Sequence, residues 1–520
     1  MVSDGHEVKG GFWGTLRAMG MSEYATYDGL GLAELVATGK VHPRELVDEA
    51  IARIERDNPR LNAVIHRMYE SARKAADLPA GSGPAPADAP FRGVPFLAKD
   101  LVSSWKGEPM AAGTRFLLGR VSDKDTELTT RYRRAGLLTV GKTNTPELGL
   151  LPVTEPEVFG PSRNPWDTSR TTGGSSGGSG AAVAAGFVPL AGGGDGGGSI
   201  RIPSSCCGLF GHKPTRGRTP IGPDVGEAWQ GCAIEHVLTR SVRDSAAMLD
   251  AIGGPDPGAP YITAPPARPF LAEVGTPPGR LRIAYTTRAL LPTDVHPECV
   301  RAVEGAAALL RELGHDVVEE HPRFDAEQFA VDFVYMLVGE TAAEVAEMEA
   351  LVGRSVRVGD LERDTHVLAR LGNVVSARDF ALACRRVRRV SRQLADFFTR
   401  NDLLLTPTLA LPPVTIGELA PRGAEAALLG VMQRLPIGKL LLEVGVLDKM
   451  AQKAWAFTPF TAVFNATGQP ACSLPLHWTP DGLPIGVQLV GRFAEDATLF
   501  RVASQVERAR PWKDRRPPGF

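Results

Sequence analysis

The chain has 520 residues, of which 58 are basic and 59 acidic, so its formal net charge is -1. This balance gives no support to binding of nucleic acid or of an anionic membrane surface, because both favour a basic protein. Hydrophobic residues make up 43% and charged residues 22% of the chain, which is typical of a globular protein with a large buried core.

The first 27 residues predict a flexible N-terminal extension rather than a targeting segment. Charged residues such as Asp4, Glu7 and Lys9 interrupt them, so they lack the apolar stretch of a secretory signal. The sequence also has no run of 18 or more apolar residues that could span a membrane. We therefore expect a cytoplasmic protein.

Helical periodicity begins after this extension, in segments 32–37, 45–56 and 61–76. These three segments predict a helical N-terminal region over residues 28–77. Residues 78–90 read LPAGSGPAPADAP, and their Pro, Gly and Ala content predicts a flexible linker.

From residue 91 onward, apolar strand-like runs alternate with helical segments. Residues 91–252 form the expected core, in which the small side chains of 181–185 predict a closely packed buried helix. This alternation predicts an α/β fold with a large mixed central sheet covered by helices on both faces. The expected strands are 94–97, 137–140, 282–285, 317–320, 403–406, 471–476 and 486–490, and the expected helices are 126–135, 241–252 and 299–313.

Two later stretches, 323–400 and about 424–456, are mostly helical and predict insertions that cap the core. Within the second stretch, the apolar runs lie at 428–432 and 440–450. These helices either pack on the core as ordinary structural elements or also wall a substrate pocket, and the pattern leaves both open. Residues 513–520 form a short tail.

The six cysteines are too few for a disulfide scaffold in a chain of this length. Cys206 and Cys207 are adjacent, and the sequence has no C-x-x-C or Cys/His spacing of the kind that binds metal. We therefore expect neither a metal site nor a cofactor.

The segment 173–205 is the most informative part of the sequence, reading GGSSGGSGAAVAAGFVPLAGGGDGGGSIRIPSS. Glycine permits backbone conformations that a side chain forbids and brings N–H groups close to a ligand. A serine beside several such N–H groups supplies what acyl transfer needs, a nucleophile and donors for the oxyanion.

Together with Gly93-Val-Pro-Phe-Leu-Ala-Lys99-Asp100 upstream, this segment resembles the signature of the amidase signature family of serine hydrolases. Ser199 follows Ser175 by 24 residues, which is the family spacing between nucleophile and bridging serine. The likeness covers roughly residues 28–512, which are expected to form a single amidase signature domain. Further family motifs occur in the same order as in the family. These motifs are GKTNTPE at 141–147, RNPW at 163–166, KPTRG at 213–217, GQP at 468–470 and GLPIGVQ at 482–488.

Within this family, several motifs resemble those of the bacterial hydrolases of cyclic nylon oligomers, the 6-aminohexanoate cyclic dimer hydrolases. They are the run from Thr145-Pro-Glu147 through Thr154-Glu-Pro156, and the pair Gly353-Arg354.

The resemblance implies a Ser–Ser–Lys triad in which Ser199 is the nucleophile, Ser175 the bridge and Lys99 the base. It also implies a cis peptide bond between Gly174 and Ser175. The oxyanion hole is expected from the N–H groups of Gly196, Gly197, Gly198 and Ser199. Matching family positions give Ser176, Asp195 and Arg201 a role in organising this loop by hydrogen bonds.

Lys99 can serve as a base only when neutral, and burial in the apolar strand before it lowers its pKa from about 10.4. Asp100 would oppose this, but adjacent strand residues point to opposite faces, so we expect its carboxylate to face away. Gly194 and Gly196 depart from the family pattern, which has larger residues there. This departure predicts a more flexible loop around Asp195.

The resemblance implies a hydrolase of non-peptide amide C–N bonds that forms an acyl-enzyme. Linear, aryl and cyclic amides are the expected small-molecule substrates, and carbamates (a urethanase activity) and esters remain open, as does a homodimer. An apolar pocket is expected for the acyl group. Its expected substrate-binding residues are Leu148, Gly149, Leu150, Gly174 and Trp455, with Leu151 nearby.

Other functions are compatible with parts of the pattern. Residues 173–177 also match the G-x-S-x-G nucleophile elbow, which would make Ser175 the nucleophile and need a later Asp and His. A glutamine amidotransferase subunit that supplies ammonia to a partner would need a polar pocket for a free amino acid. A non-catalytic binding protein would not need an intact triad, and phosphate binding lacks the G-x-x-x-x-G-K-[ST] motif.

Overall fold

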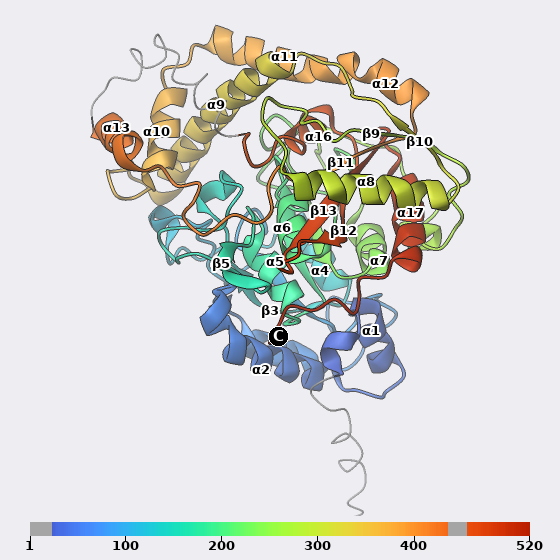
Figure 1. Cartoon of the computed structure of the whole chain (residues 1–520). Coiled ribbons are helices and arrows are strands. Elements are labelled where there is room, and N and C mark those ends of the chain that lie inside the picture. The colour runs from blue at the N-terminus through green and yellow to red at the C-terminus, as the bar shows by residue number, and fades with distance from the viewer. Residues whose placement is uncertain (1–22, 435–454) are drawn as a thin grey trace, which may run out of the picture.

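The computed structural model describes residues 23–434 and 455–520, and one mixed 11-stranded sheet runs through them (Figure 1). Its strand order is β1-β3-β2-β6-β8-β7-β12-β13-β11-β9-β10, and β4 and β5 form a separate pair. The strands are β1 (Val64–Arg67), β2 (Pro95–Lys99), β3 (Leu138–Thr143), β4 (Arg163–Asn164), β5 (Asp167–Thr171), β6 (Leu190–Asp195), β7 (Phe210–Lys213), β8 (Ile234–Thr239), β9 (Arg282–Tyr285), β10 (Asp316–Glu319), β11 (Leu403–Pro407), β12 (Ala471–Trp478) and β13 (Pro484–Gly491).

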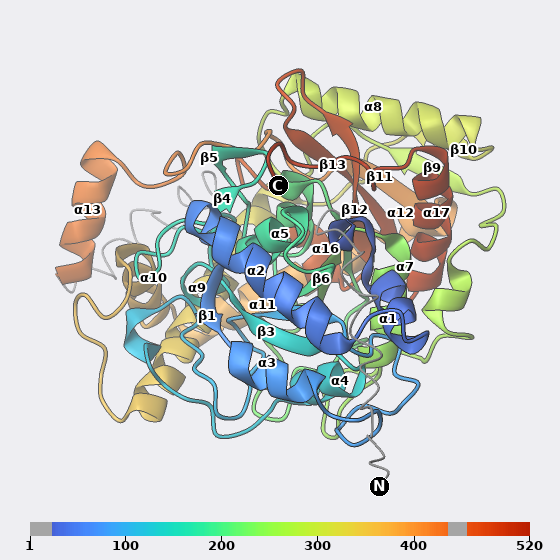
Figure 2. The ribbon, with the colours of Figure 1, turned by 90° about the horizontal axis from the view of Figure 1, so that it is seen from below.

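Helices cover both faces of this sheet, and the views in Figures 1 and 2 show α2 and α8 far apart on the outside. Alternate residues of β11 point to opposite faces, because Leu403 and Leu405 pack with α8 and α17 while Leu404 packs with α9 and α11. The helices are α1 (Gly29–Ala37), α2 (Pro43–Leu61), α3 (Tyr69–Ala76), α4 (Glu127–Arg134), α5 (Gly177–Ala184), α6 (Arg201–Cys207), α7 (Val242–Ile252), α8 (Pro297–Glu312), α9 (Ala326–Val352), α10 (Arg363–Gly372), α11 (Ala377–Gln393), α12 (Ala395–Arg400), α13 (Gly423–Arg434), α16 (Ala462–Thr467) and α17 (Asp496–Ala509).

The predicted fold class is confirmed, and most predicted elements occur within a few residues of their expected bounds. The predicted strand–helix–strand unit is β9, α8 and β10, in which the two strands are parallel. Helix α5 is buried throughout, as its small residues predicted. The segment 78–90 contains no helix or strand.

The prediction of one helix over 61–76 was wrong in its first half. Asn62 takes a left-handed conformation (φ 50°) and ends α2, so the chain turns at this point. The following residues form β1, which pairs antiparallel with β3 at the edge of the sheet. Helix α3 begins only at Tyr69.

Three strands near the middle of the sheet were not predicted, namely β6, β7 and β8. Strand β6 has the sequence LAGGGD, and glycine is depleted in ordinary strands, so its pattern did not indicate one. The structure gives the reason for glycine at 193 and 194, because a Cβ at either position would overlap a side chain of β8.

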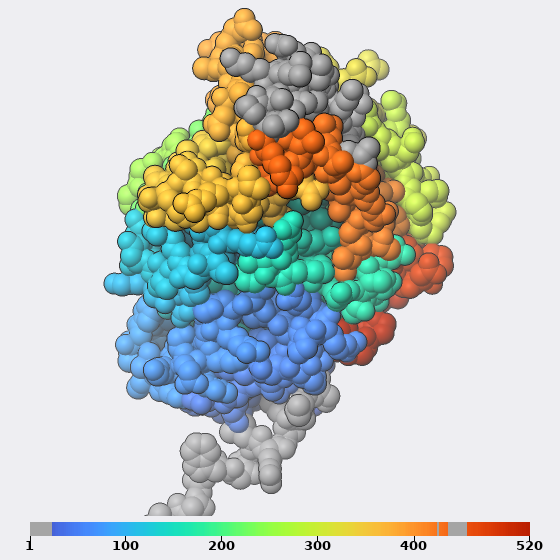
Figure 3. Space-filling model, turned by 90° about the vertical axis from the view of Figure 1, so that its left-hand side faces the viewer, coloured from blue at the N-terminus to red at the C-terminus, as the bar shows by residue number. Residues whose placement is uncertain are grey.

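The predicted cap over 323–400 consists of α9, α10, α11 and α12, in which α9 contacts both α10 and α11. Figure 3 shows the yellow and orange cap above the cyan core segments. Of the second predicted insertion, α13 contains the run at 428–432, and the run at 440–450 lies outside the described residues.

The described ends of the chain pack onto the core. Tyr24 is buried and its hydroxyl donates a hydrogen bond to the Phe187 carbonyl (3.1 Å), so packing begins within the segment expected to be an extension. At the other end, the Arg60 guanidinium of α2 lies over the ring of Phe520. None of the helices described here combines the length and apolarity needed to cross a bilayer.

Candidate active site

Lys99 and Ser175 form a direct contact inside the protein. Lys99 is the last residue of β2, and Ser175 precedes α5. The Lys99 Nζ donates a hydrogen bond to Ser175 Oγ at 2.7 Å, and each residue is only 2% exposed. The Gly174–Ser175 peptide bond is cis, as the family resemblance implied.

Ser199 lies in the turn between β6 and α6 and is 8% exposed. Its carbonyl accepts a hydrogen bond from the backbone N–H of Ser176 (3.3 Å), which joins the two serine segments. Lys99, Ser175 and Ser199 all line one cavity of about 270 Å³. The fold therefore brings together three residues that are up to 100 positions apart in the sequence.

The turn at 196–199 presents backbone donors. The N–H groups of these four residues donate to no acceptor in the described part of the chain, whereas the next N–H, that of Ile200, donates to the Asp195 carboxylate. The Thr461 hydroxyl donates to the Gly197 carbonyl at 2.6 Å and holds the turn from the other side. Gly196 lines the cavity beside Ser199. Free donors beside a serine hydroxyl are what an oxyanion hole requires.

Gly198→Ala is expected to lower kcat/KM for amide hydrolysis by at least about 10²-fold, the usual effect of losing one oxyanion donor. Gly198 has φ +133°, and a Cβ there would lie 2.7 Å from Thr461 Cβ and from Ile202 Cδ1. The backbone must therefore shift, which moves the donors. The matched comparison is Gly197→Ala, whose Cβ meets no atom within 4 Å, so its loss should be far smaller. Equal losses in the two variants would contradict this geometry.

Asp195 and Arg201 anchor the turn to the rest of the protein. They form a fully buried pair in which Arg201 Nε and Nη2 donate to the two Asp195 carboxylate oxygens at 2.9 and 2.8 Å. Arg201 also donates to Gln488 Oε1 (2.6 Å) and Asn465 Oδ1 (2.6 Å). Burial alone would raise the pKa of Asp195, but the Arg201 charge and hydrogen bonds lower it to about 2. Ser176 completes the network, since its hydroxyl donates to the Gly194 carbonyl (3.3 Å).

Two residues that the sequence did not indicate fill the space left by Gly194 and Gly196. A Cβ at Gly194 would overlap the Glu235 carboxyl group, 2.9 Å from its Cδ. A Cβ at Gly196 would lie 2.8 Å from the ring of Trp229. Glu235 and Trp229 both line the cavity. The two glycines are therefore positions where a larger side chain would clash with these residues. The pairing of β6 with β8 places Glu235 against Gly194.

The Lys99 amine is in the environment that a base requires. Burial lowers its pKa to about 8, although the charges of Glu235 on β8 and Asp195 on β6 raise it. The Asp100 carboxylate is not among the charges that raise the pKa of Lys99. Its side chain is instead directed to Lys142 on β3, whose Nζ lies 3.5 Å from an Asp100 oxygen. The prediction that Asp100 faces away from Lys99 is thus confirmed.

Glu235→Gln is expected to move the acid limb of the activity profile to lower pH, by about one unit. The Glu235 carboxylate favours the ammonium form of Lys99, so removing the negative charge lowers the pKa of Lys99 and leaves more of the neutral base at a given pH. The measurement is kcat/KM for an amide between pH 6 and 10. An unchanged limb, or one that moves to higher pH, would show that Glu235 does not act on Lys99 in this way.

The predicted substrate-binding residues separate into two groups. Leu148 and Gly149 line the cavity, whereas Leu150, Gly174 and Trp455 are not among the residues described as lining it. The Trp455 indole donates to the Ala330 carbonyl (3.3 Å) and packs edge-to-face on Phe333 within the cap.

The cavity is also less apolar than expected. Its wall carries the carboxylates of Asp195, Asp224, Glu227, Glu235, Glu340, Glu344 and Glu347.

No histidine is among the described residues that line this cavity, so the site does not hold the histidine of a nucleophile elbow. His212 instead pairs with Asp496 (3.2 Å) and His236 with Ser245 (2.9 Å).

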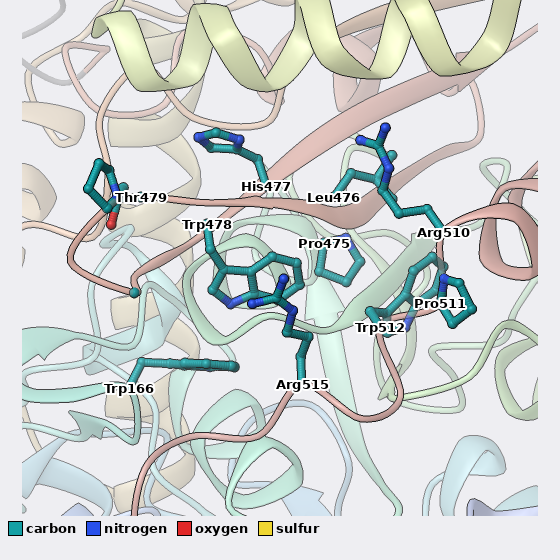
Figure 4. Close-up of a pocket in the computed structure, with 12 residues that line it drawn as sticks. Trp166, Pro475, Leu476, His477, Trp478, Thr479, Arg510, Pro511, Trp512 and Arg515 are labelled. Carbon is teal, nitrogen blue, oxygen red and sulfur yellow. The ribbon is translucent and has the colours of Figure 1, made fainter. Parts of the chain in front are cut away.

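A second cavity of about 510 Å³ lies near the C-terminal segment and contains neither serine nor lysine among its described lining residues. Trp166, Trp478 and Trp512 form much of its wall, and Figure 4 shows these rings around Arg515. The Arg515 guanidinium lies over the Trp478 ring, 4.9 Å from its centroid. The indole N–H groups of Trp166 and Trp512 donate to backbone carbonyls. Its described lining therefore lacks the serine and lysine that the first cavity contains.

The chain is similar to known amidases over most of its length. The family model described as Amidase matches residues 45–500. The 6-aminohexanoate-cyclic-dimer hydrolase of Pseudomonas sp. (strain NK87) is 37% identical over 497 residues, covering 94% of this chain and 96% of that protein. The solved structure of a 6-aminohexanoate cyclic dimer hydrolase has a TM-score of 0.84 at 36% identity and covers 95% of this chain and 99% of that chain.

A bacterial aryl acylamidase of the amidase signature family has a TM-score of 0.79 at 26% identity, covering 94% of this chain and 96% of that chain. The family match spans most of the chain, and relatives of this similarity cover it almost from end to end. The chain therefore belongs to the amidase signature family and is an enzyme that hydrolyses amides.

Proposed function

We propose that this enzyme hydrolyses non-peptide amide C–N bonds through an acyl-enzyme on Ser199, with Ser175 and Lys99 as its proton relay. The observation that carries the proposal is the 2.7 Å contact between the buried Lys99 Nζ and Ser175 Oγ, in the same cavity as Ser199. A serine hydroxyl needs a base to become a nucleophile, and a buried lysine with a lowered pKa is such a base.

In the first half of the reaction, Ser199 Oγ attacks the amide carbonyl carbon. Its proton passes to Ser175 Oγ while the Ser175 proton passes to the neutral Lys99 amine. The carbonyl oxygen becomes an oxyanion, which the N–H groups of residues 196–199 stabilise. These donors are fixed in the turn before the charge forms, so no reorganisation is needed during the step.

Collapse of the tetrahedral intermediate breaks the C–N bond. The proton returns from Lys99 through Ser175 to the leaving nitrogen, because an amide nitrogen leaves poorly as an anion. The acyl group stays on Ser199 as an ester. A water molecule then attacks this ester with the same relay as base, which releases the carboxylic acid and restores the Ser199 hydroxyl.

The substrates that fit this machinery are small amides, whether linear, aryl or cyclic. The hydrolase and acylamidase relatives support this range, since their names refer to a cyclic amide and to aryl amides. Esters and carbamates have the same acyl carbon and a better leaving group, so they can react at the same serine.

The test is hydrolysis of a panel of purified substrates by the chain alone, comprising a linear, an aryl and a cyclic amide, a phenyl carbamate and glutamine. Release of acid and amine from the non-peptide amides, with much slower release of ammonia from glutamine, supports the proposal. Hydrolysis of glutamine as the preferred substrate would instead favour an amidotransferase subunit.

A further inference from the structure

One wall of the active-site cavity is a row of carboxylates on the cap. Glu340, Glu344 and Glu347 lie on α9 at spacings of four and three residues, so they share one face of the helix. All three line the cavity that contains Ser199. Like charges at this spacing destabilise a helix, so the row is unfavourable unless something else compensates it.

Within the part of the chain that is described, no cation of the protein compensates this row. Lys99 is the one basic residue among the described lining residues. Glu340 accepts a hydrogen bond from the Gln230 amide (2.8 Å), a neutral group. Arg388 reaches the other end of that amide (3.2 Å) but does not line the cavity.

Glu344 is the centre of this row and has no hydrogen-bond or ion-pair partner in the described residues. Burial, together with the charges of Glu347, Glu340 and Glu147, raises its pKa to about 8. Among the described residues, the charges that act on it are all negative. A cation beside Glu344 would therefore gain the attraction of several carboxylates at once.

A carboxylate on another element, β8, adds to the negative charge of the cavity. Glu235 is 4% exposed, lines the cavity from β8 and accepts no hydrogen bond in the described residues. The Lys99 amine beside it donates to Ser175 instead, so the Glu235 carboxylate receives no hydrogen bond from that amine. Negative charge thus borders the cavity from the catalytic end to the cap.

The arrangement does not suit a metal ion. No group of three or more His, Cys, Asp or Glu residues that could hold a metal occurs in the described ranges. The carboxylates are instead spread along a cavity that also contains Leu101, Leu148 and Ile221. An alkyl chain ending in an ammonium group matches this mixture of apolar and acidic walls.

From these contacts we infer that the preferred substrates are amides that carry a protonated amine, whose ammonium group binds against Glu340, Glu344 and Glu347. This inference rests on the proposed function, since it specifies the substrate class of the Ser199 site. The inference covers an amine on the acyl side and one on the leaving-group side of the amide, because the row and the nucleophile line the same cavity.

The experiment compares matched pairs of amides at pH 9, where an alkylamine is still mostly protonated. In each pair, an ω-ammonioalkanamide or an N-(ω-ammonioalkyl)acetamide is set against the same molecule ending in a methyl group. Wild type should show a kcat/KM at least about tenfold higher for the cationic member at the best chain length, and this preference should shrink at high salt. Glu344→Gln should reduce the ratio of cationic to neutral kcat/KM about tenfold.

The matched control is Glu327→Gln, which removes a carboxylate from the exposed first turn of the same helix. It should keep the wild-type ratio. Equal rates for both members of every pair, with hydrolysis intact, would overturn the inference and leave the proposed function standing.

A binding measurement tests the cation site in the case where the enzyme hydrolyses neither the cationic nor the neutral amides. If neither series is hydrolysed, the shift in Tm caused by hexylammonium is compared with that caused by 1-hexanol. A larger shift with hexylammonium in wild type, absent in Glu344→Gln, would support the cation site and count against the proposed function. No such difference would overturn the cation site.

Discussion

Ser199→Ala is expected to lower kcat/KM for every amide substrate by at least roughly 10⁴-fold, because it removes the atom that forms the acyl bond. The change deletes one hydroxyl from a turn that is held by Asp195, Arg201 and Thr461, so the fold should be unaffected. The measurement is steady-state hydrolysis of one amide and one ester by wild type and variant, with thermal unfolding as the check of folding.

Ser169→Ala serves as the comparison, since Ser169 is exposed on β5 and its hydroxyl donates a hydrogen bond to the neighbouring Asp167 carboxylate (2.7 Å). It should retain wild-type kinetics. Activity of Ser199→Ala within tenfold of wild type would exclude Ser199 as the nucleophile, and a complete loss confined to Ser175→Ala would favour the nucleophile-elbow interpretation.

Lys99→Met is expected to lower kcat/KM by about 10²- to 10⁴-fold, the usual contribution of a general base. Methionine has a similar length, so the loss reports the missing amine rather than a cavity. In wild type, kcat/KM should rise with pH up to about 8 and then level off, because burial places the pKa of Lys99 near 8 and only the neutral amine accepts a proton. In Lys99→Met this rise should disappear.

Lys142→Met is the matched control for the loss of a buried lysine. Lys142 is fully buried on the neighbouring strand β3, where its Nζ donates to the Pro109 carbonyl and lies 3.5 Å from Asp100. It does not line the cavity, so its variant should keep the rise toward pH 8 even if it unfolds at a lower temperature. Persistence of the same rise in Lys99→Met would remove Lys99 from the role of base.

The proposed triad could be derived from the sequence because its residues lie in short motifs with fixed spacing. Lys99 and Ser175 are far apart in the sequence and come together only when the chain folds. The family resemblance nevertheless predicted that they share one site, and the structure has a 2.7 Å contact between them. The sheet was also predictable where strands are apolar, as in β9 and β11. It was not predictable in β6, because this central strand contains three glycines and glycine is uncommon in strands.

The walls of the cavity were far less predictable. Glu235 comes 36 residues after Ser199, and only the antiparallel pairing of Gly194 with Glu235 brings its carboxyl group into the site. The acidic row on α9 lies in a segment whose pattern indicated a cap helix but not which face of that helix lines the cavity. Trp455 was expected at the pocket from its apolar character. Its ring packs edge-to-face on Phe333 of α9, and its part in substrate binding stays a prediction.

The most direct test of the catalytic assignment is peptide mapping by mass spectrometry after treatment with a small sulfonyl fluoride, for wild type and Lys99→Met side by side. The Ser–Ser–Lys relay predicts a single adduct on Ser199 in wild type and much slower formation of the same adduct in the variant. An adduct on Ser175, or equal labelling rates in the two proteins, would contradict it.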